Sequence, residues 1–383
     1  MRVLQVTSVY YPELKFGGPP QKIHSLSSGL VERGYEVQVV TLKSGDRRAF
    51  YNEPVDHINV QYLPWIGKGS LQLHSGLTRL FRLVKWADLV HCYGIYNMLC
   101  PTAAFFARRL GRPYILEPLG MYVPRLRNVR AKELYHKLFT SGMAQGAVAV
   151  IAASAPEAKD LSHLVEPERL VLRRNGIDLE PFKHLPERSE FRERFNIDPS
   201  EHLIMYIGRI SPIKNLEQLV LAYKYAALDN ARLALIGPTL EPEYAARLHS
   251  LIAEQGLEEK VLMLGPLYDQ DKLLALASAD LFVLPSISES YGNAAAEAVA
   301  AGVPVLVTDG CGIASAIDRR AGLAVEMSVE ALAEGLRILT TDDTARVQLT
   351  RDRDKVLKEL SWDEPLAQTE ALYTRVTLNY QTS

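Results

Sequence analysis

The sequence contains few cysteines and no long apolar run. Its three cysteines, Cys92, Cys100 and Cys311, form no Cys-x-x-Cys pair, which argues against a disulfide framework and a zinc site and is typical of a reducing compartment. No run of about 18 or more apolar residues could cross a bilayer. Because Val3–Thr7 already reads as a strand, there is no room before it for a signal peptide. These absences predict a cytoplasmic protein, with peripheral contact at the inner face of the membrane left open.

The sequence also lacks an excess of either charge. It has 43 Lys and Arg residues against 45 Asp and Glu residues, a formal net charge of −2. No overall basic field therefore exists to hold a nucleic acid, and any anion site must be local. At 383 residues the chain exceeds the roughly 250–300 residues that one core supports, so it should form more than one domain.

Short β-branched runs alternate with segments of helical periodicity, which predicts an α/β fold with parallel sheets. Two series of strands follow one another, at Val3–Thr7, Val37–Leu42, Ile58–Leu63, Leu89–Cys92, Tyr114–Glu117 and Ala147–Ala152, and then at Leu203–Ile207, Leu233–Ile236, Val261–Leu264, Leu281–Leu284 and Val305–Thr308. We expect two doubly wound domains, residues 1–175 and 176–361, that face each other across a ligand-binding cleft, and a closing helix within residues 362–383.

The strongest local signal follows the strand that ends at Leu284. Gly292 and Asn293 supply a turn and an N-cap before an Ala-rich helix, whose free N–H groups can bind an anion. Glu297, one turn into the helix, could accept hydrogen bonds from sugar hydroxyls, and Glu289 lies in the preceding loop. The alternative is a capped core helix with an exposed acidic residue.

A second signal follows the strand Leu203–Ile207. Gly208 lets the backbone approach a ligand, Arg209 offers a planar fork for phosphate oxygens, and Lys214 supplies a point charge. Two solvated surface cations are the alternative. Their position at the carboxyl end of a strand favours a diphosphate site.

A third signal is the pair Gly17 and Gly18 between the first strand and the first helix, where backbone could press against a ligand or simply make a tight turn. No Gly-x-Gly-x-x-Gly and no P-loop sequence occurs, so a nicotinamide cofactor is not indicated. His91, near a strand end, is either a group facing the cleft or a hydrogen-bonded core histidine. The pair Asp352 and Asp354 lies in a charged segment that reads as a solvated helix, so we do not expect a metal there.

A basic amphipathic segment runs from Arg125 to Lys137. It is either solvated surface or a contact for anionic lipid or a phosphate-bearing acceptor. Its members are Arg125, Arg127, Arg130, Lys132, His136 and Lys137, interleaved with Leu126, Leu134, Leu138 and Phe139.

In combination these motifs resemble the family 4 glycosyltransferases, over essentially the whole chain. The resemblance implies two facing Rossmann-like domains of the GT-B fold, a nucleotide-diphosphate sugar as substrate, and neither a cofactor nor a metal. Arg209 and Lys214 would bind the diphosphate, Glu297 the ribose, and Gly18 a phosphate. The resemblance places the transferred sugar against Glu289, Ser290, Tyr291, Gly292 and Asn293, the nucleobase against Pro266 and Leu267, and catalysis on Glu289, Arg209, Lys214 and His91.

One position departs from the family pattern. Many members carry a histidine where this chain has Leu119, whose side chain cannot hydrogen-bond a sugar, so Glu117, His91 or a backbone carbonyl would have to replace it. The resemblance implies transfer of a hexose-type sugar with retention, with UDP favoured as carrier and a glycan or lipid-linked acceptor in polysaccharide biosynthesis. The rival readings are a nucleotide-sugar epimerase or hydrolase on the same scaffold, and a noncatalytic sugar-binding protein.

Overall fold

The computed structural model describes residues 1–13, 18–42, 51–66, 73–122 and 134–381, and the chain divides into two compact units. The first comprises Met1–Gly176 together with Trp362–Ser383, and the second is the uninterrupted stretch Ile177–Ser361. None of the described helices is both long enough and apolar enough to span a membrane.

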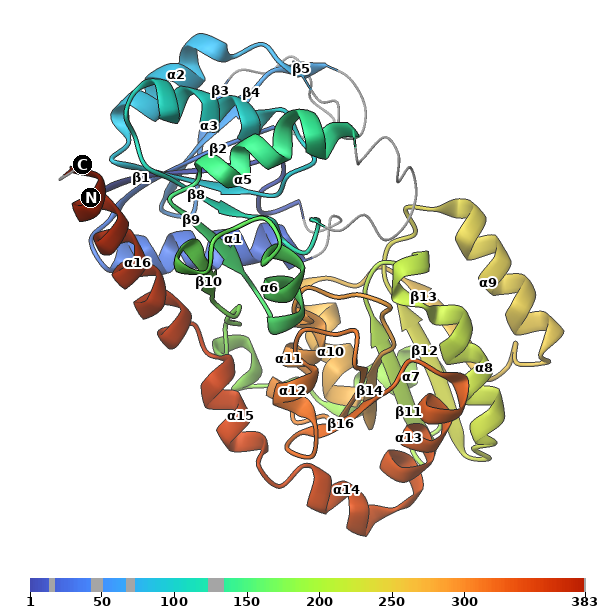
Figure 1. Ribbon diagram of the computed structural model, residues 1–383. Coiled ribbons are helices and arrows are strands. Elements are labelled where there is room, and N and C mark those ends of the chain that lie inside the picture. Colours follow the sequence, from blue (N-terminus) through green and yellow to red (C-terminus); the bar gives the residue numbers. More distant parts are fainter. Residues whose placement is uncertain (14–17, 43–50, 67–72, 123–133, 382–383) are drawn as a thin grey trace. The chain divides into compact units, whose positions relative to one another are not determined.

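The first unit is built on a sheet of eight strands (Figure 1). Its order is β10-β9-β8-β7-β1-β2-β4-β3, and all neighbours are parallel except β3 and β4. The strands are β1 (Arg2–Thr7), β2 (Glu36–Leu42), β3 (Tyr51–Val55), β4 (Ile58–Leu63), β7 (Leu89–Tyr93), β8 (Tyr114–Glu117), β9 (Ala149–Ala152) and β10 (Leu170–Leu172), with β5 (Trp65–Ile66) and β6 (Leu73–His74) forming a separate ribbon.

Alternate residues of these strands face two different cores, as the two-residue period of a strand requires. Val3 belongs to the core beneath α1 (Gly18–Glu32) and α16 (Asp363–Gln381), whereas Leu4 belongs to the core beneath the other helices. Those helices are α2 (Leu77–Trp86), α3 (Leu99–Arg109), the π-helical turn η2 (His136–Thr140), α5 (Ser141–Gly146) and α6 (Ala155–Leu161).

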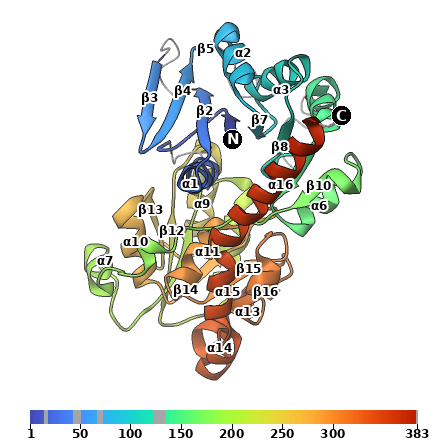
Figure 2. The same ribbon diagram turned by 90° about the vertical axis from the view of Figure 1, so that its left-hand side faces the viewer.

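The last helix of the chain belongs to the first unit. Figure 2 shows α16 beside α1, and its residues Leu366, Leu372, Tyr373 and Val376 are buried in the core that includes Val3. Gly29 allows this packing, because a Cβ there would lie 2.5 Å from a methyl carbon of Leu366.

The second unit carries a six-stranded parallel sheet of order β13-β12-β11-β14-β15-β16. Its strands are β11 (His202–Ile207), β12 (Ala231–Ile236), β13 (Val261–Gly265), β14 (Leu281–Leu284), β15 (Val305–Thr308) and β16 (Gly322–Val325). Its helices are α7 (Arg188–Arg194), α8 (Leu216–Ala226), α9 (Pro242–Glu254), α10 (Asp269–Ser278), α11 (Asn293–Ala300), α12 (Ala314–Ile317), α13 (Val329–Thr341), α14 (Asp343–Leu349) and α15 (Arg353–Leu360). The strand order reverses between β11 and β14, and ligands of doubly wound sheets bind at the carboxyl ends of strands at such a switch point.

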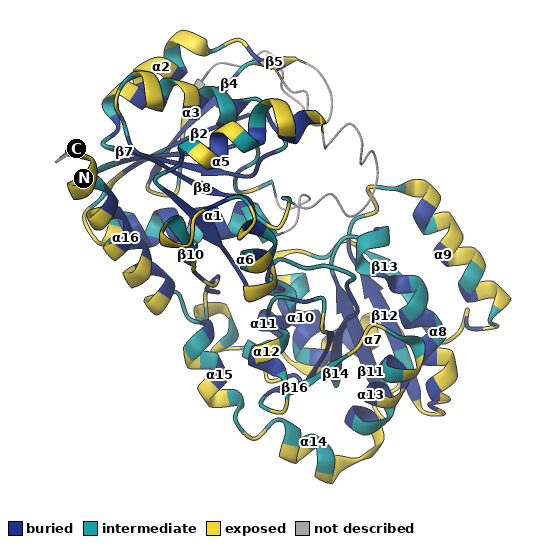
Figure 3. Ribbon diagram, viewed as in Figure 1, coloured by how far each residue is buried: buried dark blue, intermediate teal, exposed yellow. Residues whose placement is uncertain are grey.

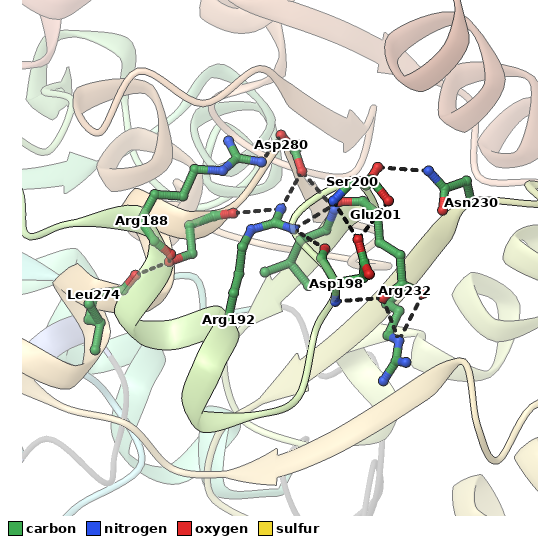
Figure 4. A network of polar contacts seen from close by, with 11 residues as sticks. Arg188, Arg192, Asp198, Ser200, Glu201, Asn230, Arg232, Leu274 and Asp280 are labelled. Atoms are coloured by element: carbon green, nitrogen blue, oxygen red, sulfur yellow. Dashed lines mark hydrogen bonds and ion pairs between the residues drawn. The ribbon is translucent and has the colours of Figure 1, made fainter.

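A polar network lies at the amino-terminal ends of the central strands β11 and β14 (Figure 4). Asp280 accepts a hydrogen bond from the Leu203 N–H at 2.8 Å and forms ion pairs with Arg188 and Arg192. Arg192 is buried and also donates to the backbone carbonyls of Asp198 and Glu201. This network attaches α7 to the sheet, at the end away from the switch point, and we assign it a structural role.

Candidate functional site

The carboxyl end of β11 brings two backbone segments unusually close together. Gly237 follows β12 with φ +149°, and a Cβ on it would lie 1.8 Å from the Gly208 carbonyl oxygen. A Cβ on Gly208 would lie 2.5 Å from the Tyr206 hydroxyl. Both positions therefore require glycine, which leaves the backbone uncovered beside Arg209.

Arg209 is held by its backbone and free at its side chain. The buried Tyr206 hydroxyl donates to the Arg209 carbonyl at 2.8 Å, whereas the half-buried guanidinium makes no hydrogen bond or ion pair with any residue that the structure describes. Burial raises the pKa of Tyr206 well above its ordinary value; the Glu289 charge raises it further and Arg209 opposes it, so both charges lie near this hydroxyl. A half-buried cation without a partner is suited to an incoming anion.

Lys214 and Glu289 form an ion pair between the loops that follow β11 and β14. Their side chains are 13% and 20% exposed, so the pair is largely shielded from water. The Ile287 N–H donates to the Ile213 carbonyl at 2.9 Å and joins the two loops. Glu289 itself is fixed through its N–H and carbonyl, which bond to Gly310 and Gly312 at 3.0 and 2.9 Å.

The start of α11 presents donors without acceptors. Gly292 adopts φ +115° as the residue before the helix, and no side chain caps it. Within the described residues, the backbone N–H groups of Ser290, Gly292 and Ala294 have no hydrogen-bond partner. The first N–H groups of a helix carry the positive end of its dipole, so this loop can bind a phosphate or a sugar hydroxyl. Tyr291 is buried and its carbonyl accepts from the Ile313 N–H at 2.7 Å, which holds the loop in place.

Glu297 is paired with Lys272, a residue that the sequence did not single out. The Lys272 Nζ on α10 lies 2.8 Å from a Glu297 carboxylate oxygen, and the two side chains are 28% and 20% exposed. The pair is 25 residues apart in the chain, so no local spacing could indicate it. Next to α10, the predicted nucleobase loop is exposed at Pro266, while Leu267 packs partly against the core.

These contacts gather most of the predicted residues of the second unit around its switch point, whereas Pro266 and Leu267 follow the edge strand β13. Gly208, Arg209, Lys214, Glu289 and the segment 290–293 lie at the carboxyl ends of β11 and β14, and Glu297 lies on the helix that follows. The predicted Gly18 belongs to the first unit, where it begins α1. The predicted Gly17 lies outside the described residues.

Two protein-family models account for most of the sequence. The model described as "Glycosyl transferases group 1" matches residues 187–355, and the model described as "Glycosyl transferase 4-like domain" matches residues 17–176. The chain belongs to the group 1 glycosyltransferases.

Relatives of this glycosyltransferase carry the same activity in their names. It is 28% identical to the D-inositol 3-phosphate glycosyltransferase of Xylanimonas cellulosilytica, over 94% of this chain and 92% of that protein. It is 25% identical to an uncharacterized glycosyltransferase of Methanocaldococcus jannaschii, over 97% and 98%. A match to the D-inositol 3-phosphate glycosyltransferase of Corynebacterium glutamicum, 28% identical, spans 58% of this chain and 56% of that protein.

Solved structures establish the GT-B fold of the glycosyltransferase. Sucrose-phosphate synthase from Thermosynechococcus elongatus superposes with a TM-score of 0.78 at 21% identity, over 99% of each chain. Anabaena HepE, solved in complex with UDP and glucose, superposes with a TM-score of 0.77 at 19% identity, over 98% of this chain and 100% of that one.

His91 needs a correction, because the structure places it in the core of the glycosyltransferase. It lies in the middle of β7, which continues to Tyr93, and its side chain is 0% exposed. Its Nδ1 lies 2.7 Å from the Tyr373 hydroxyl and 3.0 Å from the Tyr93 hydroxyl. This is the hydrogen-bonded core histidine that the sequence left as the alternative, so we do not retain His91 as a catalytic residue.

Around His91 lies a fully buried charge cluster that the sequence did not indicate. Glu117 forms ion pairs with Lys22 and, at 2.7 Å, with Arg173, and it lies 3.6 Å from His91 Nε2. Arg173 also donates to Thr369 of α16 at 2.8 Å. Burial alone would raise the pKa of Glu117, but the two cations outweigh it and hold that pKa below its usual range, whereas burial lowers the pKa of Lys22. Glu117 therefore anchors charges and is not available to replace the histidine missing at Leu119.

Protonation of His91 is expected to destabilise the first unit in mild acid. Burial lowers the pKa of His91 from 6.5 to about 4. Between these pH values the unfolded chain binds a proton that the folded chain does not, so stability falls as the pH drops from about 6.5 to about 4, by at most about 3 kcal/mol. All three tryptophans, Trp65, Trp86 and Trp362, belong to the first unit, so tryptophan fluorescence during urea unfolding reports on that unit. His91→Gln should flatten this slope, and an unchanged slope in that variant would contradict the assignment.

The basic segment 125–137 is described only in part. Arg125, Arg127, Arg130 and Lys132 lie outside the described residues. His136 is buried and its Nε2 lies 2.7 Å from the Tyr96 hydroxyl, so it cannot contact a lipid headgroup in this conformation. Lys137 is exposed, as are Leu134 and Leu138 at 58% and 63%.

Proposed function

We propose that this glycosyltransferase moves a hexose-type sugar from a nucleoside-diphosphate donor, with a UDP-sugar favoured, to a glycan or lipid-linked acceptor in polysaccharide biosynthesis. The observation that carries the proposal is the Arg209 guanidinium, which has no partner among the described residues, at the same switch point as the N–H groups of Ser290, Gly292 and Ala294, which have none there either. A diphosphate needs several donors and compensating positive charge, and these groups offer both. UDP is favoured because the HepE structure contains UDP and glucose.

In this proposal Arg209 and Lys214 neutralise the charge that develops on the departing diphosphate. Lys214 is paired with Glu289 in the free protein, so donor binding would place the sugar against Glu289 and the phosphates against Lys214. Alignment of two reactants can lower a barrier by about 7–11 kcal/mol, more than one helix terminus contributes. Positioning is therefore the larger part of catalysis.

We propose that transfer retains the anomeric configuration, with the acceptor attacking on the face that the diphosphate leaves. The acceptor proton then passes to a phosphate oxygen of the leaving group. Both carboxylates at the site are paired with lysines, Glu289 with Lys214 and Glu297 with Lys272, which weakens either as a covalent nucleophile. Within the described residues, no three His, Cys, Asp or Glu side chains are grouped to hold a metal, and the proposal requires neither metal nor cofactor.

We also propose that the enzyme works in the cytoplasm, with peripheral contact to the inner face of the membrane through the segment Arg125–Lys137.

The relatives named D-inositol 3-phosphate glycosyltransferase point to a phosphorylated polyol as the rival acceptor. Product analysis with and without each acceptor separates transfer from hydrolysis or epimerisation.

Thermal-shift measurements with UDP-, GDP- and ADP-glucose test the donor, since a ligand at about 100 times its Kd stabilises the fold by about 2.7 kcal/mol. Protection by none of the three would refute the proposed donor class.

Glu297→Ala is expected to weaken the binding of UDP by about 10- to 100-fold, because a hydrogen bond to a charged group contributes about 1.5–3 kcal/mol. Calorimetry with UDP measures the loss. UDP without its two ribose hydroxyls provides the matched control and should bind both proteins equally. Lys272→Met should weaken UDP binding in the same direction by releasing the Glu297 carboxylate, whereas Lys224→Met, at an exposed lysine of α8, should leave it unchanged. Equal UDP affinity in the wild type and Glu297→Ala would exclude the ribose contact.

A further inference from the structure

Helices α2 and α3 of the first unit present cations and no acidic residue. Arg82, Lys85, Arg108 and Arg109 are all exposed, and neither helix contains Asp or Glu. The whole chain has a net charge of −2, so this concentration of positive charge is local. Figure 3 shows exposed residues along the outer sides of both helices.

These cations also lack acidic partners within the part of the chain that the structure describes. None of the four forms an ion pair with any residue in the described ranges. On the second unit, by contrast, three exposed arginines are neutralised: Arg188 pairs with Asp280, Arg194 with Asp271, and Arg247 with Glu217. Unpaired cations on adjoining helices repel one another and lower stability, which an anionic partner would relieve.

Large apolar side chains are exposed among these cations. Leu77 is 50%, Phe81 37% and Phe105 54% exposed. The Phe81 ring meets Phe106 edge-on at 5.4 Å, and the Arg109 guanidinium lies 5.5 Å from the centre of the Phe105 ring. The two helices therefore form one continuous surface of mixed apolar and positive character, which we call the α2–α3 face.

The helices are held together on the side away from solvent. Leu80, Leu83 and Val84 of α2 share a core with Ala103 and Ala107 of α3. Arg112, after α3, donates to the Lys85 carbonyl at 2.9 Å. The α2–α3 face is thus a fixed surface that does not need a partner in order to form.

We propose that the α2–α3 face docks on an anionic phospholipid surface. Exposed Phe and Leu among Arg and Lys match the headgroup boundary, where apolar side chains enter the acyl region and cations meet the phosphates. A nucleic acid would use the cations and rings but would leave Leu77 without a role. The inference extends the proposed membrane contact to residues outside segment 125–137, and it does not depend on which acceptor is used.

Vesicle flotation with the full-length protein tests this inference. Binding is expected to vesicles of phosphatidylcholine with about 30% phosphatidylglycerol, not to phosphatidylcholine alone, and it should weaken as salt shortens the range of the electrostatic attraction. Each cation near an anionic surface contributes about fivefold in affinity. The variant R82Q/K85Q/R108Q/R109Q should therefore bind at least about a hundredfold more weakly. The control R194Q/K224Q/R247Q/R351Q removes four cations from the second unit and should bind like the wild type.

Phe105→Ser tests the apolar half of the face. It should weaken vesicle binding by about tenfold, and the loss should remain at high salt because it is hydrophobic in origin. UDP affinity should be unchanged in every variant, which separates failure of this inference from failure of the proposed donor site. No binding to anionic vesicles, equal loss in the second-unit control, or displacement of the vesicles by a single-stranded oligonucleotide at equal charge would each overturn the proposal.

Discussion

Replacing Lys214 by alanine is expected to lower the turnover of sugar transfer by about 100- to 1,000-fold, the range found when one charged or hydrogen-bonding stabiliser of a transition state is removed. Lys214 stands at the switch point with Arg209, and its ammonium would balance the charge that grows on the leaving diphosphate. The effect should fall on kcat more than on KM, because the charge is larger in the transition state than in the bound donor.

The Lys214→Ala variant needs a check that the site itself is intact. The loss of Lys214 leaves the Glu289 carboxylate without its partner, and repulsion between that charge and the diphosphate of the donor could mimic a catalytic defect. Lys214→Arg keeps a cation beside Glu289 and should recover much of the turnover, whereas Lys214→Met, which keeps the length but not the charge, should recover little if Lys214 acts on the diphosphate. Lys224→Ala serves as a lysine control. Sugar transfer at the wild-type rate by Lys214→Ala would rule out its role at the diphosphate.

Glu117→Ala is expected to destabilise the first unit by about 3–5 kcal/mol, the cost of breaking a buried ion pair by removing one partner. Its side chain and that of Arg173 are 0% exposed, and Lys22 is 2% exposed, so water cannot solvate the two cations that remain. Tryptophan fluorescence during urea unfolding follows the loss, since all the tryptophans belong to this unit.

A second substitution distinguishes charge from packing. Glu117→Ala/Lys22→Met removes one negative and one positive charge, so its cluster keeps the net charge of the wild type. It should be more stable than Glu117→Ala alone. Tyr373→Phe removes only the hydroxyl that hydrogen-bonds to His91. It should lower the free energy of unfolding by about 0.5–1.5 kcal/mol. A loss of less than about 1 kcal/mol in Glu117→Ala, within the range of ordinary substitutions, would show that the cluster does not stabilise the unit.

The grouping of Arg209 and Glu289 in the second unit could be predicted from sequence, because both residues lie in short loops that follow strands. Arg209 comes two residues after β11, and Glu289 five residues after β14, and parallel strands place such loops at one edge of the sheet. Strand β16 was not predicted, since Gly322–Val325 begins with glycine, which disfavours a strand, and contains only one β-branched residue. The charged segment around Asp352 and Asp354, predicted as a solvated helix, is instead part of two helices, α14 and α15, with Asp352 just before α15.

The buried cluster of the first unit could not be predicted in this way. Lys22 and Glu117 are 95 residues apart and Arg173 a further 56, so their pairing depends on the tertiary fold. For His91 the strand end was placed one residue too early, because Tyr93 continues β7 as a buried aromatic. The role of Lys272 could not be predicted either, because its partner Glu297 lies on another helix and the pairing depends on the tertiary fold.

The path of the chain has a consequence for synthesis. The first unit is assembled from both ends of the sequence, whereas Ile177–Ser361 is a single stretch between them. During synthesis, the second unit can therefore complete its folding while the first unit still lacks α16. The side chains of α16 complete the apolar core of the first unit. A premature stop codon shortly before Trp362 would therefore leave the unit Ile177–Ser361 whole and expose apolar side chains of the first unit that α16 normally covers.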